Sequence, residues 1–150
     1  EQRKKIILNP APAQQLPDDI LNKITLLTPN ETECEILTGI RINTKDDASK
    51  AIQYLMNKGV KQVVVTMGSK GSVYNIGNRI EYRPARKVEA VDTTAAGDSF
   101  TAALAVGMSR ELDFEKSVEF ANVVGSLTVT KKGAQSSLPY IDEVLEIFNK

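Results

Sequence analysis

The sequence contains no histidine, a single cysteine and no excess of charge of either sign. Without histidine the commonest general base and metal ligand of proteins is missing, so acid–base chemistry falls to carboxylates. The one cysteine, Cys34, excludes an internal disulfide, which fits a reducing compartment. No basic residue beside it in sequence favours a reactive thiol, so we expect a small buried residue. The nineteen basic and nineteen acidic residues give no net charge, so the composition lacks the excess of positive charge that is typical of proteins binding nucleic acid or an anionic membrane.

Long apolar runs are also missing. No stretch approaches the length of a membrane span, and the N-terminus lacks the architecture of a signal peptide. The GxxxxGK(S/T) motif of P-loop enzymes is absent. We therefore expect a cytoplasmic protein that has neither nucleic acid nor membrane as a partner. Its 150 residues, 41% of them apolar, are enough for one domain or for part of a larger one.

Predicted strands and helices alternate along the chain. Strands are expected at 5–8, 25–28 and 62–67, and a hairpin at 72–83 turns at Gly77 and Asn78. The stretch 87–91 alternates like a further short strand. Helices are expected from Pro17, at the first helical position, through Ile24, and also near 30–37, 44–58, 96–107, 114–129 and 143–148. This order is typical of α/β proteins with a mainly parallel sheet covered by helices.

The segment 91–101 carries the strongest chemical signal. It follows a predicted strand and opens a helix, and Ala95, Ala96 and Gly97 have almost no side chain. The N–H groups of the helix start are thus left open and, with the helix dipole, form an anion site. A carboxylate beside such a site, Asp98, suits a base acting next to a phosphate. The alternative is that Asp98 or Ser99 merely caps the helix.

Other polar segments allow two interpretations each. Asn30 and Glu33 fit a capping box, or a nucleotide–metal site at the end of the preceding strand. The turn Gly68–Gly71 matches neither a Rossmann fingerprint nor a P-loop, and could be purely structural. The loop 130–137 could be a solvated basic turn, and Asn122 a solvated helix residue.

Three of these segments resemble motifs of the ribokinase-like, or PfkB, family of carbohydrate kinases. Segment 91–101 is similar to the DTxAAGDxF signature, 29–33 to its PNETE motif and 66–71 to its TLGxxG loop. The resemblance runs from 9–13 to 132–135 and covers only the C-terminal half of the family. It implies a three-layer α/β/α ribokinase-like (Rossmann-like) fold, with residues 1–150 as the C-terminal nucleotide-binding and catalytic portion, a partial domain.

The resemblance also implies roles for individual residues. Asp98 would take the proton from the sugar hydroxyl, and the amides of 95–98 would hold the transferring phosphate, so the catalytic set is Asp98, Gly97, Ala96 and Ala95. ATP would contact Asn30, Thr66, Met67, Gly68, Ser69, Lys70, Gly71, Gly97, Asp98 and Asn122. Glu33 would organise Mg²⁺ through water. K⁺ would bind Asp92, Thr94, Thr128, Lys131, Gly133 and Ser137, with Lys131 offering only its carbonyl because an ammonium cannot ligate a cation.

The function implied by the resemblance is ATP-dependent phosphorylation of a sugar hydroxyl, ribose to ribose 5-phosphate. The family's N-terminal half supplies most of the sugar pocket, so we expect this chain to bind ATP without necessarily phosphorylating sugar by itself. The full-length enzyme would be a homodimer. Two alternatives remain: a relative acting on another sugar or a nucleoside, and a non-catalytic nucleotide-binding module. Retention of both Asp92 and Asp98 argues against the second.

Overall fold

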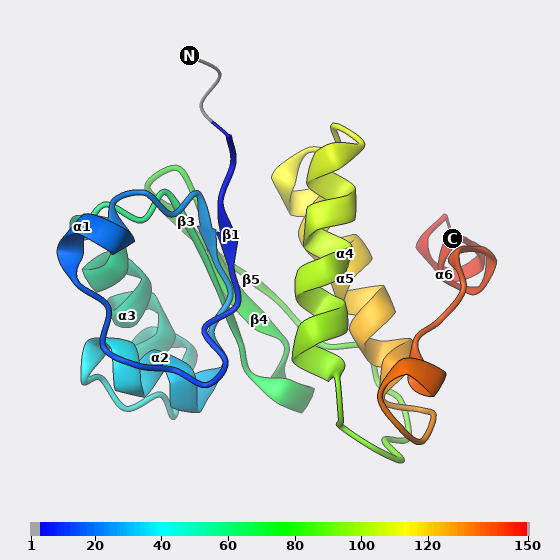
Figure 1. The fold of residues 1–150 in the computed structure, drawn as a ribbon. Coiled ribbons are helices and arrows are strands. Elements are labelled where there is room, and N and C mark those ends of the chain that lie inside the picture. Colours follow the sequence, from blue (N-terminus) through cyan, green and yellow to red (C-terminus); the bar gives the residue numbers. More distant parts are fainter. Residues whose placement is uncertain (1–3, 150) are drawn as a thin grey trace. The chain divides into compact units, whose positions relative to one another are not determined.

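The computed structural model describes residues 4–149, and the chain divides into two compact units, Glu1–Tyr82 and Arg83–Lys150 (Figure 1). The first unit holds the sheet and three helices, and the second holds three further helices. Along residues 4–149, no helix combines the length and the apolar character needed to cross a bilayer.

The sheet has five strands in the order β1-β2-β3-β4-β5. Their bounds are β1 Ile7–Leu8, β2 Leu26–Leu27, β3 Gln62–Thr66, β4 Ser72–Ile76 and β5 Arg79–Arg83. β1, β2 and β3 are parallel, and β4 runs antiparallel to β3 with Val64 opposite Tyr74. The three valines at the centre of β3 are fully buried, as expected for an interior strand of a sheet. The predicted α/β class with one hairpin is confirmed, and the sheet is mixed, with its parallel pairs at β1–β2 and β2–β3.

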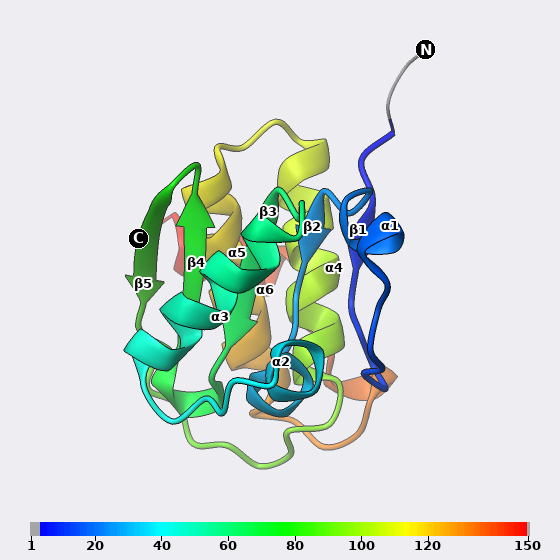
Figure 2. The same cartoon turned by 90° about the vertical axis from the view of Figure 1, so that its left-hand side faces the viewer.

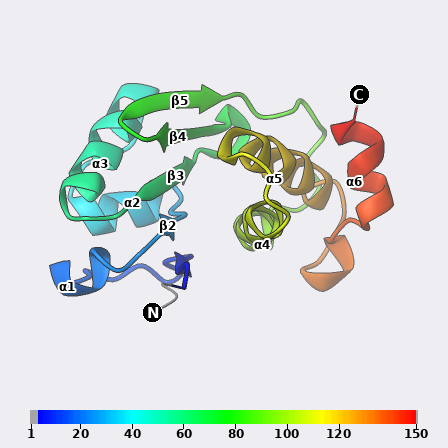
Figure 3. The same cartoon turned by 90° about the horizontal axis from the view of Figure 1, so that it is seen from above.

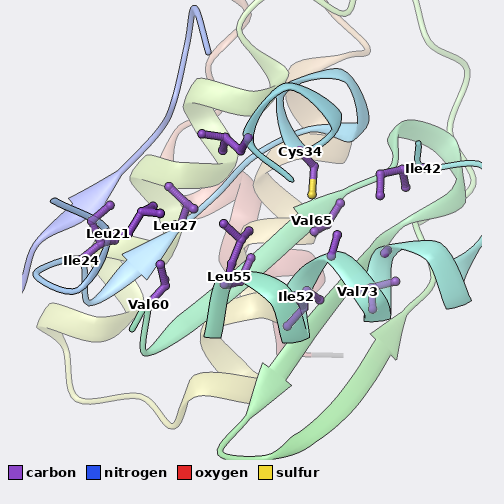
Figure 4. Close-up of a cluster of buried hydrophobic side chains, with 14 of the residues drawn as sticks. Leu21, Ile24, Leu27, Cys34, Ile42, Ile52, Leu55, Val60, Val65 and Val73 are labelled. Carbon is purple, nitrogen blue, oxygen red and sulfur yellow. The ribbon is translucent and has the colours of Figure 1, made fainter. Parts of the chain in front are cut away.

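The helices of the first unit are α1 Asp18–Leu21, α2 Glu31–Thr38 and α3 Lys45–Asn57, and a 3₁₀ turn, η1, covers Gly68–Lys70. Helices α2 and α3 lie on one face of the sheet (Figures 2 and 3). The buried positions of α3 are 48, 51, 52 and 55, the spacing of one helical face. Ile52 and Leu55 pack with Val65 and Val73 in the hydrophobic core (Figure 4). Burying each such side chain contributes about 1.5–3 kcal/mol.

The second unit consists of α4 Ala96–Ser109, α5 Phe114–Thr128, a 3₁₀ turn η2 at Gln135–Ser137, and α6 Ile141–Phe148. Helices α4 and α5 pack side by side as an antiparallel pair (Figure 1). A Cβ atom at Gly107 would lie 2.7 Å from Oγ of Ser117, so this glycine allows the two helices to approach closely. The rings of Phe120 and Phe148 meet edge to face at 5.4 Å and pack α6 against α5.

Two predictions about elements are wrong. Residues 87–91 form no strand, and Val88 and Val91 are exposed. A segment with alternating apolar residues forms a strand only where a neighbouring strand pairs with it. Here the N–H of Val91 donates to the carbonyl of Val129 instead. The helix expected from Pro17 through Ile24 is only α1, with Pro17 as its N-cap rather than its first residue. It ends at Leu21 because Lys23 and Ile24 form tight i−3 bonds that turn the chain toward β2.

Candidate active site

Helix α4 begins at a residue whose side chain cannot cap it. Its N-cap, Ala95, has the left-handed conformation (φ 61°, ψ 7°) and makes no side-chain cap bond. Such a conformation costs a non-glycine residue on the order of 1–3 kcal/mol. Main-chain bonds hold it: Ala96 N donates to Thr93 O at 3.2 Å, and Ser99 N donates to Ala95 O at 2.9 Å.

The alternative that Asp98 or Ser99 caps α4 is wrong. Asp98 is the third helical residue and is exposed, whereas Ser99 is buried and donates its hydroxyl to the carbonyl of Ala96 at 3.0 Å. The helix start therefore places a carboxylate within its first turn, after an N-cap residue that makes no side-chain cap bond. This is the local arrangement predicted for a base next to an anion site.

Gly97 lies in this first turn and is exposed. A Cβ atom at this position would meet nothing within 4 Å, so packing does not require glycine here. Glycine inside a helix costs about 1 kcal/mol relative to alanine. Its presence at an open helix start therefore favours a requirement from outside the fold, such as close approach of a ligand to the backbone.

Asp92 joins the segment before α4 to the loop after α5. Its Oδ1 accepts from Thr94 N and its Oδ2 from Gly133 N, both at 2.9 Å. Hydrogen bonds from the Thr94 side chain and from the Gly133 and Thr94 amides hold the pKa of Asp92 at about 2. The carboxylate is therefore ionised at neutral pH. Three of the predicted potassium ligands, Asp92, Thr94 and Gly133, are thus in direct contact.

The other predicted potassium ligands lie in or just before the same loop. Lys131 N donates to the carbonyl of Thr128 at 3.3 Å, and Ser137 Oγ donates to Ala134 O at 2.7 Å. The Lys131 ammonium pairs with Glu143 of α6 at 2.8 Å, which leaves its carbonyl as the expected ligand. Across residues 4–149, no three His, Cys, Asp or Glu side chains are grouped as a metal would need. A cation here would depend mainly on main-chain and hydroxyl oxygens.

Thr128 also connects the helices. Its hydroxyl is buried, 3.0 Å from Oγ of Ser99 on α4 and 2.9 Å from the carbonyl of Val124. Because Ser99 follows Asp98, this pair fixes the first turn of α4 against the last turn of α5. Sequence reasoning missed the Ser99–Thr128 contact, which depends on how the two helices pack.

In the first unit, Asn30 and Glu33 form the capping box of α2. Asn30 Oδ1 accepts from Glu33 N at 2.9 Å, and Glu33 Oε2 accepts from Asn30 N at 2.8 Å. These bonds use one oxygen of each side chain. Asn30 also forms a parallel bridge with Thr66, which places both residues at the carboxyl ends of β2 and β3. Ligands of open α/β sheets bind at such ends.

The turn after β3 has a defined main chain. Gly68 (φ 53°) and Gly71 (φ 101°) occupy conformations that side chains disfavour, and Met67 N donates to Gly71 O at 2.7 Å. Gly68, Ser69 and Lys70 are exposed, and Met67 is buried. The predicted nucleotide residues of the first unit, Asn30 and 66–71, are thus brought to one end of the sheet.

Two further sequence predictions concern single residues. Asn122, predicted near the nucleotide, lies on α5 and is half-buried; its Nδ2 donates to Val118 O at 2.9 Å. Cys34 is fully buried, and burial raises the pKa of its thiol to about 12, which confirms a structural role.

Tyr82 was not predicted as a site residue. Its hydroxyl donates to the carbonyl of Lys70 in the turn after β3, at 2.7 Å, and the ammonium of Lys45 lies 3.2 Å from its ring centroid. No local sequence signal could have found this contact, because it depends on where the hairpin returns β5.

Comparisons with known proteins agree on one family. The ribokinase of Haemophilus influenzae is 42% identical over 95% of this chain and 46% of its own length. The deoxyribokinase of Salmonella typhi is 38% identical over 95% of this chain and 47% of its own. The structure of Arabidopsis thaliana ribokinase complexed with ribose and ATP matches with a TM-score of 0.91 at 38% identity, over 97% of this chain and 48% of that one.

The chain spans about half the length of the curated relatives it matches. The structural match shows that its mixed sheet and helices form part of a ribokinase-like α/β fold. The family model for pfkB family carbohydrate kinases matches residues 1–141. The chain therefore belongs to the pfkB family of carbohydrate kinases.

Proposed function

We propose that this chain is the C-terminal, nucleotide-binding and catalytic portion of a kinase that transfers the γ-phosphoryl group of ATP to a hydroxyl of a pentose. The start of α4 carries the proposal, because it combines an uncapped helix terminus, an exposed glycine that packing does not require, and a carboxylate in the first turn. Two relatives named for ribose and deoxyribose kinases support the substrate class.

In this proposal Asp98 is the general base. Phosphoryl transfer needs positioning and charge stabilisation more than covalent chemistry. The oxygen of the sugar hydroxyl attacks the γ-phosphorus of ATP in line, Asp98 accepts the proton of that hydroxyl, and the bond from the γ-phosphorus to the bridging oxygen breaks so that ADP leaves. The amides of residues 95–98, together with the positive end of the α4 dipole, stabilise the charge that develops on the phosphoryl oxygens.

The nucleotide and cation residues follow from the same proposal. Asn30, the turn 66–71 and Asn122 contact ATP, and a solved structural neighbour that contains ATP supports this nucleotide. Glu33 organises Mg²⁺ through water, because Mg²⁺ keeps several waters and binds few carboxylates. K⁺ binds to the carbonyls and hydroxyls of the loop 128–137 together with Asp92 and Thr94. The Asp92 bridge, which orders this loop, supports the potassium proposal.

Ribose is the proposed substrate, and 2-deoxyribose is the second candidate because a deoxyribokinase is 38% identical to the chain. The remaining portion of such an enzyme would supply most of the sugar pocket. The intact kinase would work as a homodimer.

The experiment measures ADP release by the intact kinase with ribose, 2-deoxyribose and fructose, for the unchanged protein and for Asp98→Asn. We expect Asp98→Asn to lower turnover by about 10²–10⁴ and to keep Mg·ATP affinity, because only the base is removed. Asp142→Asn is the matched control: it removes an exposed acid from the first turn of α6 and should keep full activity.

Near-normal turnover of Asp98→Asn would refute Asp98 as the base. Turnover with fructose alone would refute the pentose assignment. A protein that binds Mg·ATP but phosphorylates no sugar would favour a non-catalytic nucleotide-binding module.

A further inference from the structure

Tyr82 links the end of the hairpin to the turn Gly68–Gly71. Its hydroxyl donates to the main-chain carbonyl of Lys70 at 2.7 Å. The ammonium of Lys45, the first residue of α3, lies 3.2 Å from the centroid of the Tyr82 ring. A cation over the face of an aromatic ring is attracted by the ring quadrupole, so Lys45 favours one orientation of the ring.

Lys70 is also held from its side chain. Its Nζ lies 3.4 Å from Glu31 Oε1 at the start of α2, and 3.5 Å from the carbonyl of Asn43. More than half of the Lys70 side chain is exposed, and exposed ion pairs of this kind contribute little. The bond from Tyr82 is short and acts on the main chain, so it is the stronger constraint on the conformation of the turn.

The turn needs such a constraint. It contains two glycines at positive φ, and glycine loses more conformational freedom on ordering than any other residue. When a ligand has to order a loose turn, the conformational entropy that the turn loses weakens binding. A turn that is already ordered in the free protein avoids this loss of affinity.

We propose that Tyr82 is a positioning residue that orders the turn Gly68–Gly71 before ATP binds and thereby sets the affinity for the nucleotide. The proposal rests on the proposed function of this turn in ATP binding. Tyr82 itself does not contact the reacting groups. Lys45 acts one step further away, by orienting the ring.

The test is Tyr82→Phe in the intact kinase, since this change removes the hydroxyl and keeps the ring under Lys45. We expect KM for ATP and the dissociation constant for Mg·ATP to rise roughly three- to tenfold, as for the loss of one hydrogen bond. The value of kcat should stay unchanged, and the melting temperature should fall by no more than the loss of one hydrogen bond causes. Lys45→Gln should raise KM for ATP by a smaller factor.

Tyr54→Phe is the matched control. Tyr54 is as exposed as Tyr82, 39% against 37%, and the ammonium of Lys58 lies 5.8 Å from its ring centroid. It lies on α3, outside the contacts that hold the turn, so its change should leave KM for ATP as it was.

Unchanged Mg·ATP affinity in Tyr82→Phe would overturn the positioning role alone. A fall of kcat and melting temperature together with affinity would also overturn it, because a general structural role would then explain the loss. Failure of the unchanged kinase to bind Mg·ATP would overturn the proposed function of the turn, and this inference with it.

Discussion

Helices α2 and α4 begin in opposite ways. At α2, Asn30 and Glu33 exchange two hydrogen bonds and satisfy the helix start from within the protein. At α4, the N-cap is an alanine in a left-handed conformation that offers no oxygen from its side chain. Helices α3 and α5 begin in the same way as α2, because the side chains of Thr44 and Asp113 cap them. Among these four helices, α4 alone begins without a side-chain cap.

This difference between the two helix starts shows that α4 begins in a less stable way than α2. Replacing a good N-cap by alanine costs about 0.5–2 kcal/mol, and a left-handed alanine adds strain. A helix whose role is only to pack has no reason to carry both costs. The start of α4 carries them, which supports the proposal that its first amides bind an anionic ligand.

The largest expected effect compares two glycines of α4 that receive the same substitution. Gly97→Val should lower turnover of the intact kinase by about 10²–10³, since side-chain bulk blocks the amides, without lowering the melting temperature. Gly107→Val should lower the melting temperature and largely keep turnover, because the valine side chain would collide with Ser117. We expect a loss of about 1–3 kcal/mol in the free energy of unfolding, from overpacking between α4 and α5.

Turnover assays and chemical denaturation of both variants check this pair. If Gly97→Val is unstable, the glycine serves the fold after all. If it is stable and fully active, the start of α4 does not hold the phosphate.

A smaller effect is expected at the start of α2. Asn30→Ala removes the cap and should lower the free energy of unfolding by about 0.5–2 kcal/mol. Asn30→Asp keeps an oxygen that accepts from Glu33 N, so stability should be nearly retained. A charge at this position should still repel the phosphates of ATP and weaken Mg·ATP binding. Equal Mg·ATP affinity of Asn30→Asp and the unchanged protein would show that the capping box is the whole role of Asn30.

The smallest effect concerns Asp92 and acid. Its pKa in the folded chain, about 2, lies below the ordinary value of 3.8. The folded state therefore gains from the ionised form above about pH 4, and this gain is lost as the pH falls toward 2. The melting temperature should fall more steeply between pH 4 and 2 in the unchanged protein than in Asp92→Asn. Parallel curves in thermal scans would mean that the bonds from Thr94 and Gly133 do not stabilise the folded state.

Local rules predicted much of the fold. The cap at Asn30 follows from a side chain that bonds three residues ahead, and the hairpin follows from Gly77 and Asn78. These signals lie within a few residues of their effect. The stretch 87–91 shows the limit, because its alternation is that of a strand while the chain there bonds to the end of α5.

Contacts that join distant residues were not predictable. Tyr82 reaches Lys70 only through the register of the hairpin, and Ser99 reaches Thr128 only through the packing of α4 on α5. The prediction of residues 92–98 as site residues came from their small and acidic side chains at a helix start and from a family resemblance. The left-handed Ala95 came from neither, since alanine is disfavoured in that conformation.

The ties between residues 91–92 and the end of α5 couple two helix termini that would otherwise fray independently. Val91 and Asp92 both donate to the carbonyl of Val129, and Asp92 accepts from Gly133. These bonds join the chain just before α4 to the chain just after α5, so we expect the first turn of α4 and the last turn of α5 to open together. In native-state hydrogen exchange these two ends should behave as one cooperative unit, with the Gly133 amide reporting on the opening of both.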